Sequence, residues 1–287
     1  MKSVPAAIAA ALLWFAPATA AAAPGNPPSW TAPYPPFRVI DNVYYVGTTG
    51  ISAWLIATPK GLILIDVGMP RAARLVEGNI RALGFQPADV KILLVSHAHF
   101  DHAGGLARVK RDTHATLMAG AGDRQALETG TYVGSESRRD WDFPPVKVDH
   151  ALADGEEVRL GGVVLTALAT PGHTAGCTSY LMTVREAGQA HRAIFFCSAS
   201  VAANRLAPDP HYPGVVADYR RTFARLKTLS PDIYLAPHAE FFDLAGKRAA
   251  MGPGKPNPFV RPGEFTAAMA EFETDFEAAL ARRTGGG

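Results

Sequence analysis

The sequence contains little cysteine. Cys177 and Cys197 are the two cysteines among 287 residues, so the chain can form one internal disulfide at most. They lie on segments that we expect to be neighbouring antiparallel strands, almost symmetrically about a loop at 185–189. That arrangement could set them opposite each other, although a cross-strand bridge requires particular geometry. We expect buried thiols, which pack as small hydrophobic groups, and keep the disulfide as the alternative.

The sequence also lacks a surplus of charge of either sign. Its 28 Lys and Arg residues stand against 26 Asp and Glu residues, which leaves a net charge of +2. This balance creates no strong field toward nucleic acid, and no basic cluster with interleaved aromatic residues occurs. We therefore exclude nucleic acid as a partner. A hydrophobic fraction of 48% fits a globular protein with a substantial core.

Apolar runs long enough to cross a bilayer are absent as well. At the N-terminus, a positive start at Met1 and Lys2 precedes a short apolar stretch at 6–15 and an Ala-Thr-Ala segment. This order predicts a secretory signal peptide over 1–20, cleaved near Ala20 to Ala23. No cysteine follows for lipid attachment. We therefore expect a soluble periplasmic protein with no membrane contact in its mature form, and a monomer.

The rest of the chain is expected to form one α/β domain over 37–287, preceded by a Pro-rich segment at 24–36. Trp30 and Tyr34 in that segment suggest that it packs, without regular structure, over the rim of a site. Neither of two successive halves can cover both faces of its sheet, so we expect two packed sheets, helices outside, and ligands on loops at one edge. The expected strands lie at 37–46, 51–58, 62–65, 91–95, 116–118, 156–160, 163–168, 178–184, 193–197 and 233–236. The expected helices lie at 71–83, 105–111, 121–128, 218–229 and 265–280, and 130–145 is expected to be a mobile loop.

One short stretch concentrates the side chains that can bind metal. After the apolar strand at 91–95 comes the pattern H-x-H-x-D-H, which holds His97, His99, Asp101 and His102 within six residues. In an extended segment, positions i and i+2 project to the same side, so His97 and His99 can share one metal. Asp101 and His102 follow where the chain turns and can face a second metal. Imidazole and carboxylate ligands suit zinc and similar ions.

Two metals need further ligands from distant segments. His173 lies in a Gly- and Pro-rich loop at a strand end and is the best candidate to join His97 and His99. His238 also follows a strand. Asp66, at the end of the strand at 62–65, is expected to orient a ligating imidazole. The remaining histidines have no partners at ligand spacing and are expected to be surface or locally hydrogen-bonded groups: His114, His150, His191 and His211.

These motifs together resemble the metallo-β-lactamase superfamily, and most closely its third subclass, subclass B3. The resemblance rests on H-x-H-x-D-H at 97–102, Pro-Gly-His-Thr at 171–174 and Pro-His at 237–238, and it covers essentially the whole mature chain. It implies a four-layer αββα sandwich with the metal site at one edge, between the two sheets. It also implies two zinc ions per chain, one held by His97, His99 and His173 and the other by Asp101, His102 and His238.

Two details of the resemblance favour a β-lactamase. Many hydrolases of this superfamily carry an Asp that bridges both metals, and the matching segment at 195–198 has no carboxylate. The first subclass binds its second zinc through a cysteine, where this chain offers His102; Cys197 is out of register for that role, and strand alternation turns it away. Ser198 and Ser200 match serines of the third subclass that contact the substrate carboxylate.

The implied reaction is zinc-dependent hydrolysis of the β-lactam amide bond in penicillins, cephalosporins and carbapenems, by a metal-bound hydroxide and without a covalent intermediate. Asp101 is the expected catalytic residue, which orients the hydroxide and helps to protonate the leaving nitrogen. Ser198 and Ser200 are interpreted as substrate-binding groups, with ordinary strand-end hydroxyls as the alternative. Two other functions stay open: a different metallo-hydrolase on the same fold, such as a lactonase or thioesterase, and a non-catalytic metal-dependent binding protein.

Overall fold

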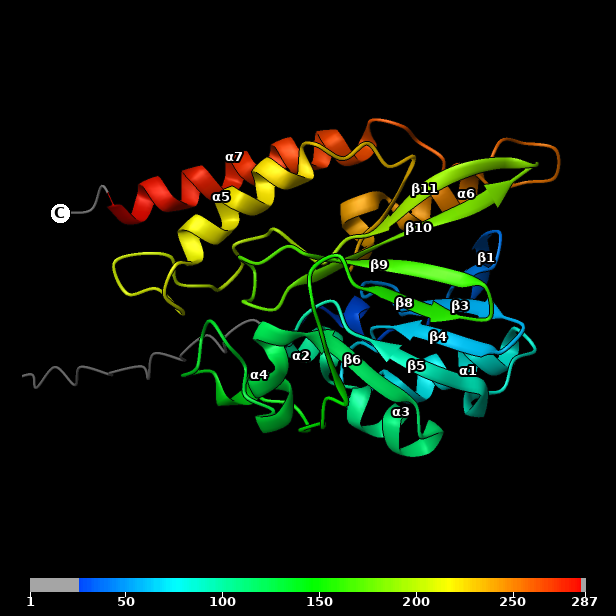
Figure 1. Ribbon diagram of the computed structural model, residues 1–287, viewed down its shortest axis with the longest axis horizontal. Coiled ribbons are helices and arrows are strands. Elements are labelled where there is room, and N and C mark those ends of the chain that lie inside the picture. Colours follow the sequence, from blue (N-terminus) through cyan, green and yellow to red (C-terminus); the bar gives the residue numbers. More distant parts are fainter. Residues whose placement is uncertain (1–25, 285–287) are drawn as a thin grey trace, which may run out of the picture.

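Two β-sheets face each other in the computed structural model, which describes residues 26–284, and helices cover both outer sides (Figure 1). The first half of the chain builds the lower two layers in Figure 1, and the second half builds most of the upper two. The αββα sandwich predicted from the sequence is confirmed. The predicted signal peptide at 1–20 lies outside the described residues.

The first sheet has seven strands that follow one another in chain order. The strands from β1 to β4 pair in antiparallel fashion, and those from β4 to β7 pair in parallel. The strands are β1 (Phe37–Ile40), β2 (Val43–Tyr45), β3 (Trp54–Thr58), β4 (Gly61–Ile65), β5 (Val90–Leu94), β6 (Thr116–Gly120) and β7 (His150–Leu152). The α-helices of this half are α1 (Ala73–Ala82), α2 (Phe100–Ala103), α3 (Leu106–Thr113) and α4 (Arg124–Thr129).

The second sheet has five strands in the order β12-β11-β10-β9-β8. Its strands are antiparallel, except that β11 and β12 pair in parallel. The strands are β8 (Glu157–Leu160), β9 (Val163–Ala169), β10 (Thr178–Glu186), β11 (Gln189–Phe195) and β12 (Ile233–Leu235). The helices of this half are α5 (Val215–Leu226), α6 (Leu244–Ala250) and α7 (Glu264–Thr284), of which α5 and α7 run side by side over the outer face (Figure 1).

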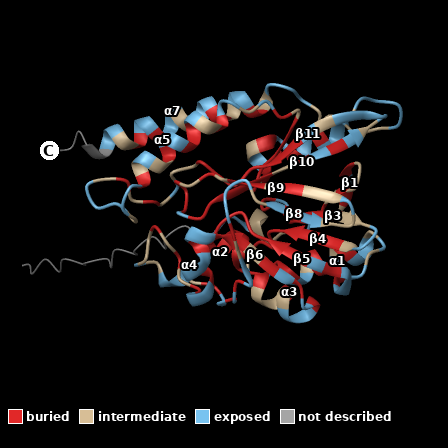
Figure 2. Cartoon of the chain, in the orientation of Figure 1, coloured by how far each residue is buried: buried red, intermediate tan, exposed pale blue. Residues whose placement is uncertain are grey.

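Strand β4 shows why its sequence is apolar without alternation. Ile63 and Ile65 belong to the core between the sheets, whereas Leu62 and Leu64 belong to the core beneath the first sheet, which also holds the buried faces of α1 and α3. A strand covered on both faces must be apolar at every position. Figure 2 shows the same pattern, with buried strands in the middle and exposed residues on the outer helix surfaces.

Several elements differ from the sequence-based expectation. The strand expected at 37–46 is a hairpin of β1 and β2, because Asp41 turns the chain in the left-handed region (φ +46°), which Asp tolerates. Strand β7 and helix α6 were not foreseen, since both are short and carry little periodic signal. Within 26–284, no helix combines the length and the apolar composition needed to cross a membrane.

The expectation of two buried thiols is wrong, because Cys177 and Cys197 form a disulfide with Cα atoms 5.9 Å apart. They lie just outside paired strands β10 and β11, whose pairing at this end sets Tyr180 opposite Phe195. Cys197 is committed to this disulfide, in line with the expectation that it is not a metal ligand. Its Sγ atom lies 3.7 Å from His97 Nδ1 and 3.1 Å from the Ser96 carbonyl oxygen, so the disulfide packs behind the first histidine of the motif.

Candidate metal centre

The H-x-H-x-D-H motif begins directly after β5 and ends in a helical turn. His97 and His99 lie on an extended segment, and Asp101 and His102 lie within α2. The turn is tight, because a Cβ atom at Gly104 would lie 2.3 Å from the Phe100 carbonyl oxygen. The four side chains of the motif are all buried. The spacing along the chain therefore directs the imidazoles of His97 and His99 to one side, and Asp101 and His102 approach from the helical turn that follows.

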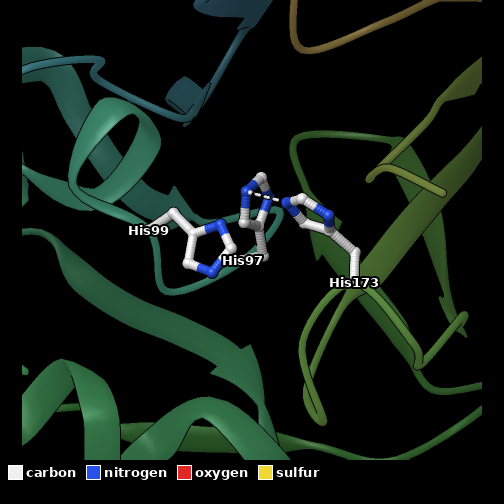
Figure 3. Close-up of side chains that lie close together, drawn as sticks. All are labelled: His97, His99 and His173. Atoms are coloured by element: carbon white, nitrogen blue, oxygen red, sulfur yellow. Dashed lines mark hydrogen bonds between the residues drawn. The ribbon is translucent and has the colours of Figure 1, made fainter. Parts of the chain in front are cut away.

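His173 completes the first group. It lies in the loop between β9 and β10, and its Nε2 atom is 3.1 Å from His97 Nε2. The donor atoms of His97, His99 and His173 all lie within 4.8 Å of one another. Figure 3 shows the three rings converging, with His97 and His99 on one loop and His173 on the loop opposite. A backbone hydrogen bond of 2.9 Å from Thr178 N to Ser96 O ties these two parts of the chain together.

Asp101, His102 and His238 form a second group beside the first. His238 follows β12, and its Nε2 atom lies 3.3 Å from His102 Nε2. Asp101 Oδ2 lies 3.4 Å from His102 Nε2 and 3.5 Å from His238 Nε2. A donor atom of His97 also lies within 4.8 Å of the donor atoms of Asp101 and His102, so the two groups adjoin. The structure thus brings together all six residues that the sequence proposed as ligands.

Each of the five imidazoles turns one nitrogen toward its group. The outer nitrogens of His97, His99 and His173 form hydrogen bonds, whereas those of His102 and His238 only lie near a carboxylate. The outer contacts are His97 Nδ1 to Ser96 Oγ (3.0 Å), His99 Nε2 to Val133 O (3.0 Å), His173 Nδ1 to Ser200 O (2.7 Å), His102 Nδ1 to Asp66 Oδ2 (3.4 Å) and His238 Nδ1 to Glu240 Oε1 (3.6 Å). Histidines that bind metal generally use the second nitrogen in this way, which fixes the ring and its tautomer. The donor set fits a metal for this reason as well as by its convergence.

Asp66 lies behind the second group, as the sequence led us to expect. Its carboxylate accepts hydrogen bonds from Ser96 N and Ser96 Oγ, both at 2.7 Å, and faces His102. The residue adopts a left-handed backbone (φ +60°), which Asp tolerates better than most side chains. It therefore links the end of β4 to the start of the motif and to one of its imidazoles.

Protonation in the metal-free protein differs among the donors. Burial, together with the neighbouring imidazoles, holds the pKa of His97 and of His99 well below the usual value. Burial also lowers the pKa of His173 to about 4 and that of His238 to about 3. These four rings are neutral at pH 7 and keep a free lone pair, which is the form that binds metal.

Asp101 and His102 instead form a charged pair. Burial alone would raise the pKa of the Asp101 carboxyl, but His102 outweighs burial and holds that pKa below its ordinary value. Burial would lower the pKa of His102, yet Asp101 and Asp66 raise it to about 10. A metal that binds at His102 would therefore have to displace a proton.

A pocket of about 320 Å³ opens onto these donors and has aromatic walls. His99 stacks on Tyr132, with ring centroids 4.3 Å apart. Trp30, from the Pro-rich segment, packs against His238 with centroids 5.4 Å apart, so the prediction that this segment covers the rim of the site is confirmed. The other aromatic lining residues are Phe100, Trp141 and Phe241.

Ser200 and Ser198 lie on the same side of the segment after β11, with Oγ atoms 3.2 Å apart. Ser200 lines the pocket. Ser198 is 2% exposed and lies behind Ser200, whose backbone N–H donates to Ser198 Oγ at 3.3 Å. A molecule in the pocket thus meets Ser200 before Ser198.

The other histidines lie outside the two groups. His150 pairs with Glu156, His191 lies 3.9 Å from Asp232, and His211 Nδ1 donates to the Arg205 carbonyl oxygen at 2.9 Å. His114 is an exposed residue at the end of α3. The reading of these four as surface or locally bonded residues is confirmed.

Sequence reasoning missed several residues that shape the centre. Tyr132 and Trp141 come from the stretch at 130–145, which has no clear periodicity, and Glu240 follows His238 in a short turn. Asp123 bonds to segments on both sides of the first group. None of them carries a local pattern, because their roles depend on contacts with distant segments.

The fold and the donor set agree with a comparison to known families. The family model described as the metallo-β-lactamase superfamily matches residues 46–238. The chain belongs to this superfamily. Its metallo-β-lactamase fold carries the histidine-rich groups described above at one edge, where two sheets meet.

Solved metallo-β-lactamases are similar to nearly the whole chain. BJP-1, a subclass B3 enzyme of Bradyrhizobium japonicum, is 48% identical at a TM-score of 0.88, covering 90% of this chain and 98% of that one. FEZ-1 from Legionella gormanii is 37% identical at a TM-score of 0.86, covering 89% of this chain and 99% of that one. These similarities identify the chain as a metallo-hydrolase.

Curated relatives that are named N-acyl homoserine lactonases match shorter parts of this chain. The N-acyl homoserine lactonase AttM of Agrobacterium fabrum is 36% identical over 108 residues, which cover 36% of this chain and 40% of the relative. The chain spans between 40% and 65% of the length of the five lactonases that it matches here. Membership of the superfamily therefore does not by itself fix the substrate.

Proposed function

We propose that this protein is a zinc-dependent β-lactamase of the subclass B3 kind, which hydrolyses the amide bond of β-lactam antibiotics. The observation that carries the proposal is the extent of the likeness. BJP-1 aligns over 90% of this chain at 48% identity, whereas the lactonases align over 36% to 57% of it at 27% to 36% identity.

The spacing of the donors supports zinc. Zinc binds imidazole nitrogen and carboxylate oxygen at about 2.0–2.2 Å in tetrahedral sites, so two of its ligand atoms lie about 3.3–3.6 Å apart. The three separations among Asp101 Oδ2, His102 Nε2 and His238 Nε2 are 3.3, 3.4 and 3.5 Å. We propose that these residues hold one zinc ion and that His97, His99 and His173 hold another.

The choice of donors supports β-lactam over lactone and thioester substrates. In the part of the chain that the structure describes, the two groups contain a single carboxylate, that of Asp101. The position after β11, where many hydrolases of the superfamily have a bridging Asp, carries Cys197 and Ser198, and Cys197 is committed to a disulfide. Three protein ligands per metal leave open positions, as a catalytic site requires.

Bound zinc would supply a water of lowered pKa and would polarise a carbonyl oxygen. The chain's own residues would do the rest. Asp101, ionised at neutral pH, would accept a hydrogen bond from the attacking water and so orient it toward the carbonyl carbon. The water oxygen would bond to the carbonyl carbon, the amide C–N bond would break, and the leaving nitrogen would take the proton that the water gives up. Ser200, with Ser198 behind it, would donate a hydrogen bond to the substrate carboxylate.

The setting of the enzyme is part of the proposal. A single catalytic domain over 37–287 would be exported through the predicted signal peptide and act as a monomer in the periplasm, where antibiotics arrive. The disulfide between Cys177 and Cys197 fits an oxidising compartment.

The test is hydrolysis of a carbapenem and a chromogenic cephalosporin by the mature protein, with EDTA and then with zinc restored. We expect turnover that the chelator abolishes and zinc recovers. An acyl homoserine lactone and a glutathione thioester are assayed in parallel on the same zinc-loaded preparation. Turnover of either of these, with both β-lactams left intact, would contradict the proposal.

A further inference from the structure

Asp123 is a buried carboxylate that touches neither metal group and has no part in the mechanism above. It ends the short 3-10 turn Ala121–Asp123 after β6 and is 3% exposed. Oδ2 accepts hydrogen bonds from Ala98 N and Thr174 Oγ1, and Oδ1 accepts one from Gly176 N, each at 2.8 Å. A buried carboxylate needs such donors, because an unpaired one is strongly destabilising.

The three donors lie on the two loops that carry the first group. Ala98 stands between His97 and His99, and Thr174 follows His173. Both loops are thus bonded to the same carboxylate, although about 75 residues separate Ala98 from Thr174 in the chain. One side chain therefore bonds to both segments whose imidazoles must converge, in addition to the backbone hydrogen bond from Thr178 N to Ser96 O.

The backbone around Asp123 packs closely against the loop after His173. A Cβ atom at Gly176 would lie 2.2 Å from the backbone nitrogen of Asp123, and one at Gly122 would lie 2.5 Å from the backbone of Ala175. Contacts this close require glycine at both positions. The segment at 120–123 and the loop after His173 are therefore in direct backbone contact, with Asp123 as the polar link between them.

We propose that Asp123 is a positioning residue for the first metal site, which holds His97, His99 and His173 at the separation that one metal ion requires. The inference rests on the metal-binding role proposed above for these histidines. It differs from the action of Asp66, which faces a single imidazole, because Asp123 acts through the backbone on both sides of the site. Outer-shell groups of metal sites typically change metal affinity about 10- to 100-fold when they are replaced.

The test uses Asp123→Asn in the full-length mature protein. The amide keeps the shape of the carboxylate but sets an N–H group against at least one of the two backbone donors. We expect affinity for the first zinc equivalent to fall about 10- to 100-fold, measured by competition with a chromogenic chelator. The absorption spectrum of the Co²⁺-loaded protein should change as well, because it reports the geometry of the ligands.

Asp149→Asn is the matched control. The Asp149 carboxylate also accepts a backbone N–H, from Leu117 at 2.9 Å, and pairs with Lys110 at 2.6 Å, but it lies at the opposite end of β6 from Asp123. We expect this variant to lose some stability and to bind zinc like the wild type. If Asp123→Asn fails to fold, Thr174→Val removes one of the three hydrogen bonds and should lower zinc affinity by a smaller factor.

The inference would be overturned if both Asp123→Asn and Thr174→Val bound zinc with wild-type affinity and showed an unchanged Co²⁺ spectrum, whatever their melting temperatures. β-Lactam turnover is measured on the same preparations. A wild-type protein that hydrolyses β-lactams, beside variants that bind zinc normally, would refute the inference alone. A wild-type protein without β-lactam turnover, beside an Asp123→Asn variant with weakened zinc binding, would refute the proposed substrate alone.

Discussion

His97 and His173 point their Nε2 atoms at each other across 3.1 Å, although they are 76 residues apart in the chain. Burial lowers the pKa of both rings, so both are neutral at pH 7. A neutral imidazole carries one ring proton, so both facing nitrogens are unprotonated when the outer nitrogens donate to Ser96 Oγ and Ser200 O, and their two lone pairs repel each other. A shared metal ion would resolve this repulsion, and the next two predictions depend on it.

Removal of metal should lower the melting temperature of the protein. A metal that binds the folded chain and not the unfolded chain stabilises it by about 2.7 kcal/mol at a free concentration 100 times the Kd. We therefore expect EDTA to shift the thermal transition downward and added zinc to restore it, as measured by calorimetry. An identical transition with and without chelator would show that the six side chains hold no metal in solution.

Replacement of His173 by alanine should remove one metal equivalent and most of the activity. Loss of a direct ligand should exceed the 10- to 100-fold effect typical of outer-shell groups, so we expect kcat/KM to fall by more than about 100-fold. Metal content by elemental analysis and turnover of a chromogenic cephalosporin check this. His191→Ala is the control, because His191 lies far from the donors and faces Asp232. Two bound equivalents in His173→Ala would contradict the ligand assignment.

Loss of the disulfide should destabilise the fold. Cys177 and Cys197 are separated by 20 positions, and closing a loop of that size stabilises a protein by about 3 kcal/mol. We expect the double variant Cys177→Ser with Cys197→Ser to lose about that free energy of unfolding in urea titrations. Reductant should have the same effect on the wild type and none on the variant. Equal stability of the wild type with and without reductant would disprove this role.

Lys247 and Glu264 form a buried ion pair, and replacing Glu264 should cost more stability than replacing Lys247. Nζ lies 2.5 Å from Glu264 Oε2, and the side chains are 1% and 19% exposed. Glu264→Ala strands a buried ammonium group, so we expect a cost of about 3–5 kcal/mol. Lys247→Met leaves a carboxylate that water can reach and fills the space with an apolar side chain, so it should cost less. Urea titrations that give the reverse order would contradict this reasoning.

The charge at the mouth of the pocket should influence the choice of β-lactam. The described residues that line the pocket include Asp101 and Glu240 and no Lys or Arg. We expect kcat/KM to be higher for a penicillin with an ammonium side chain than for one with a carboxylate side chain. Glu240→Gln should reduce that ratio about two- to five-fold, the range expected for one exposed charge.

Zinc content must be unchanged in that variant, because Glu240 also lies 3.6 Å from His238 Nδ1. Asp140→Asn is the matched control: its carboxylate is exposed and pairs with Arg138, and the residue does not line the pocket. The same ratio in wild type and Glu240→Gln would remove Glu240 as a determinant of specificity.

Much of the fold was predictable because its signals are local. The apolar run of β5 and the helical spacing of α1 and α5 depend on neighbours within a few residues, and these elements lie close to the predicted ranges. The failures fell where local signals are weak or compete. Asp41 is a single residue in the left-handed region, and it splits the first predicted strand in two. Strand β7 is only three residues long and is positioned by its pairing with β6.

The sequence by itself determined that His97, His99, Asp101 and His102 stand together, because the covalent chain allows four side chains within six residues few ways to separate. Only the tertiary structure decided which distant groups join them. The packing of the two halves brings His173 and His238 to the motif, closes the disulfide behind His97, and sets Asp123 between the two ligand loops. Local patterns mark His173 and His238 as candidates, but the contacts themselves depend on strand order and sheet packing, to which residues throughout the chain contribute.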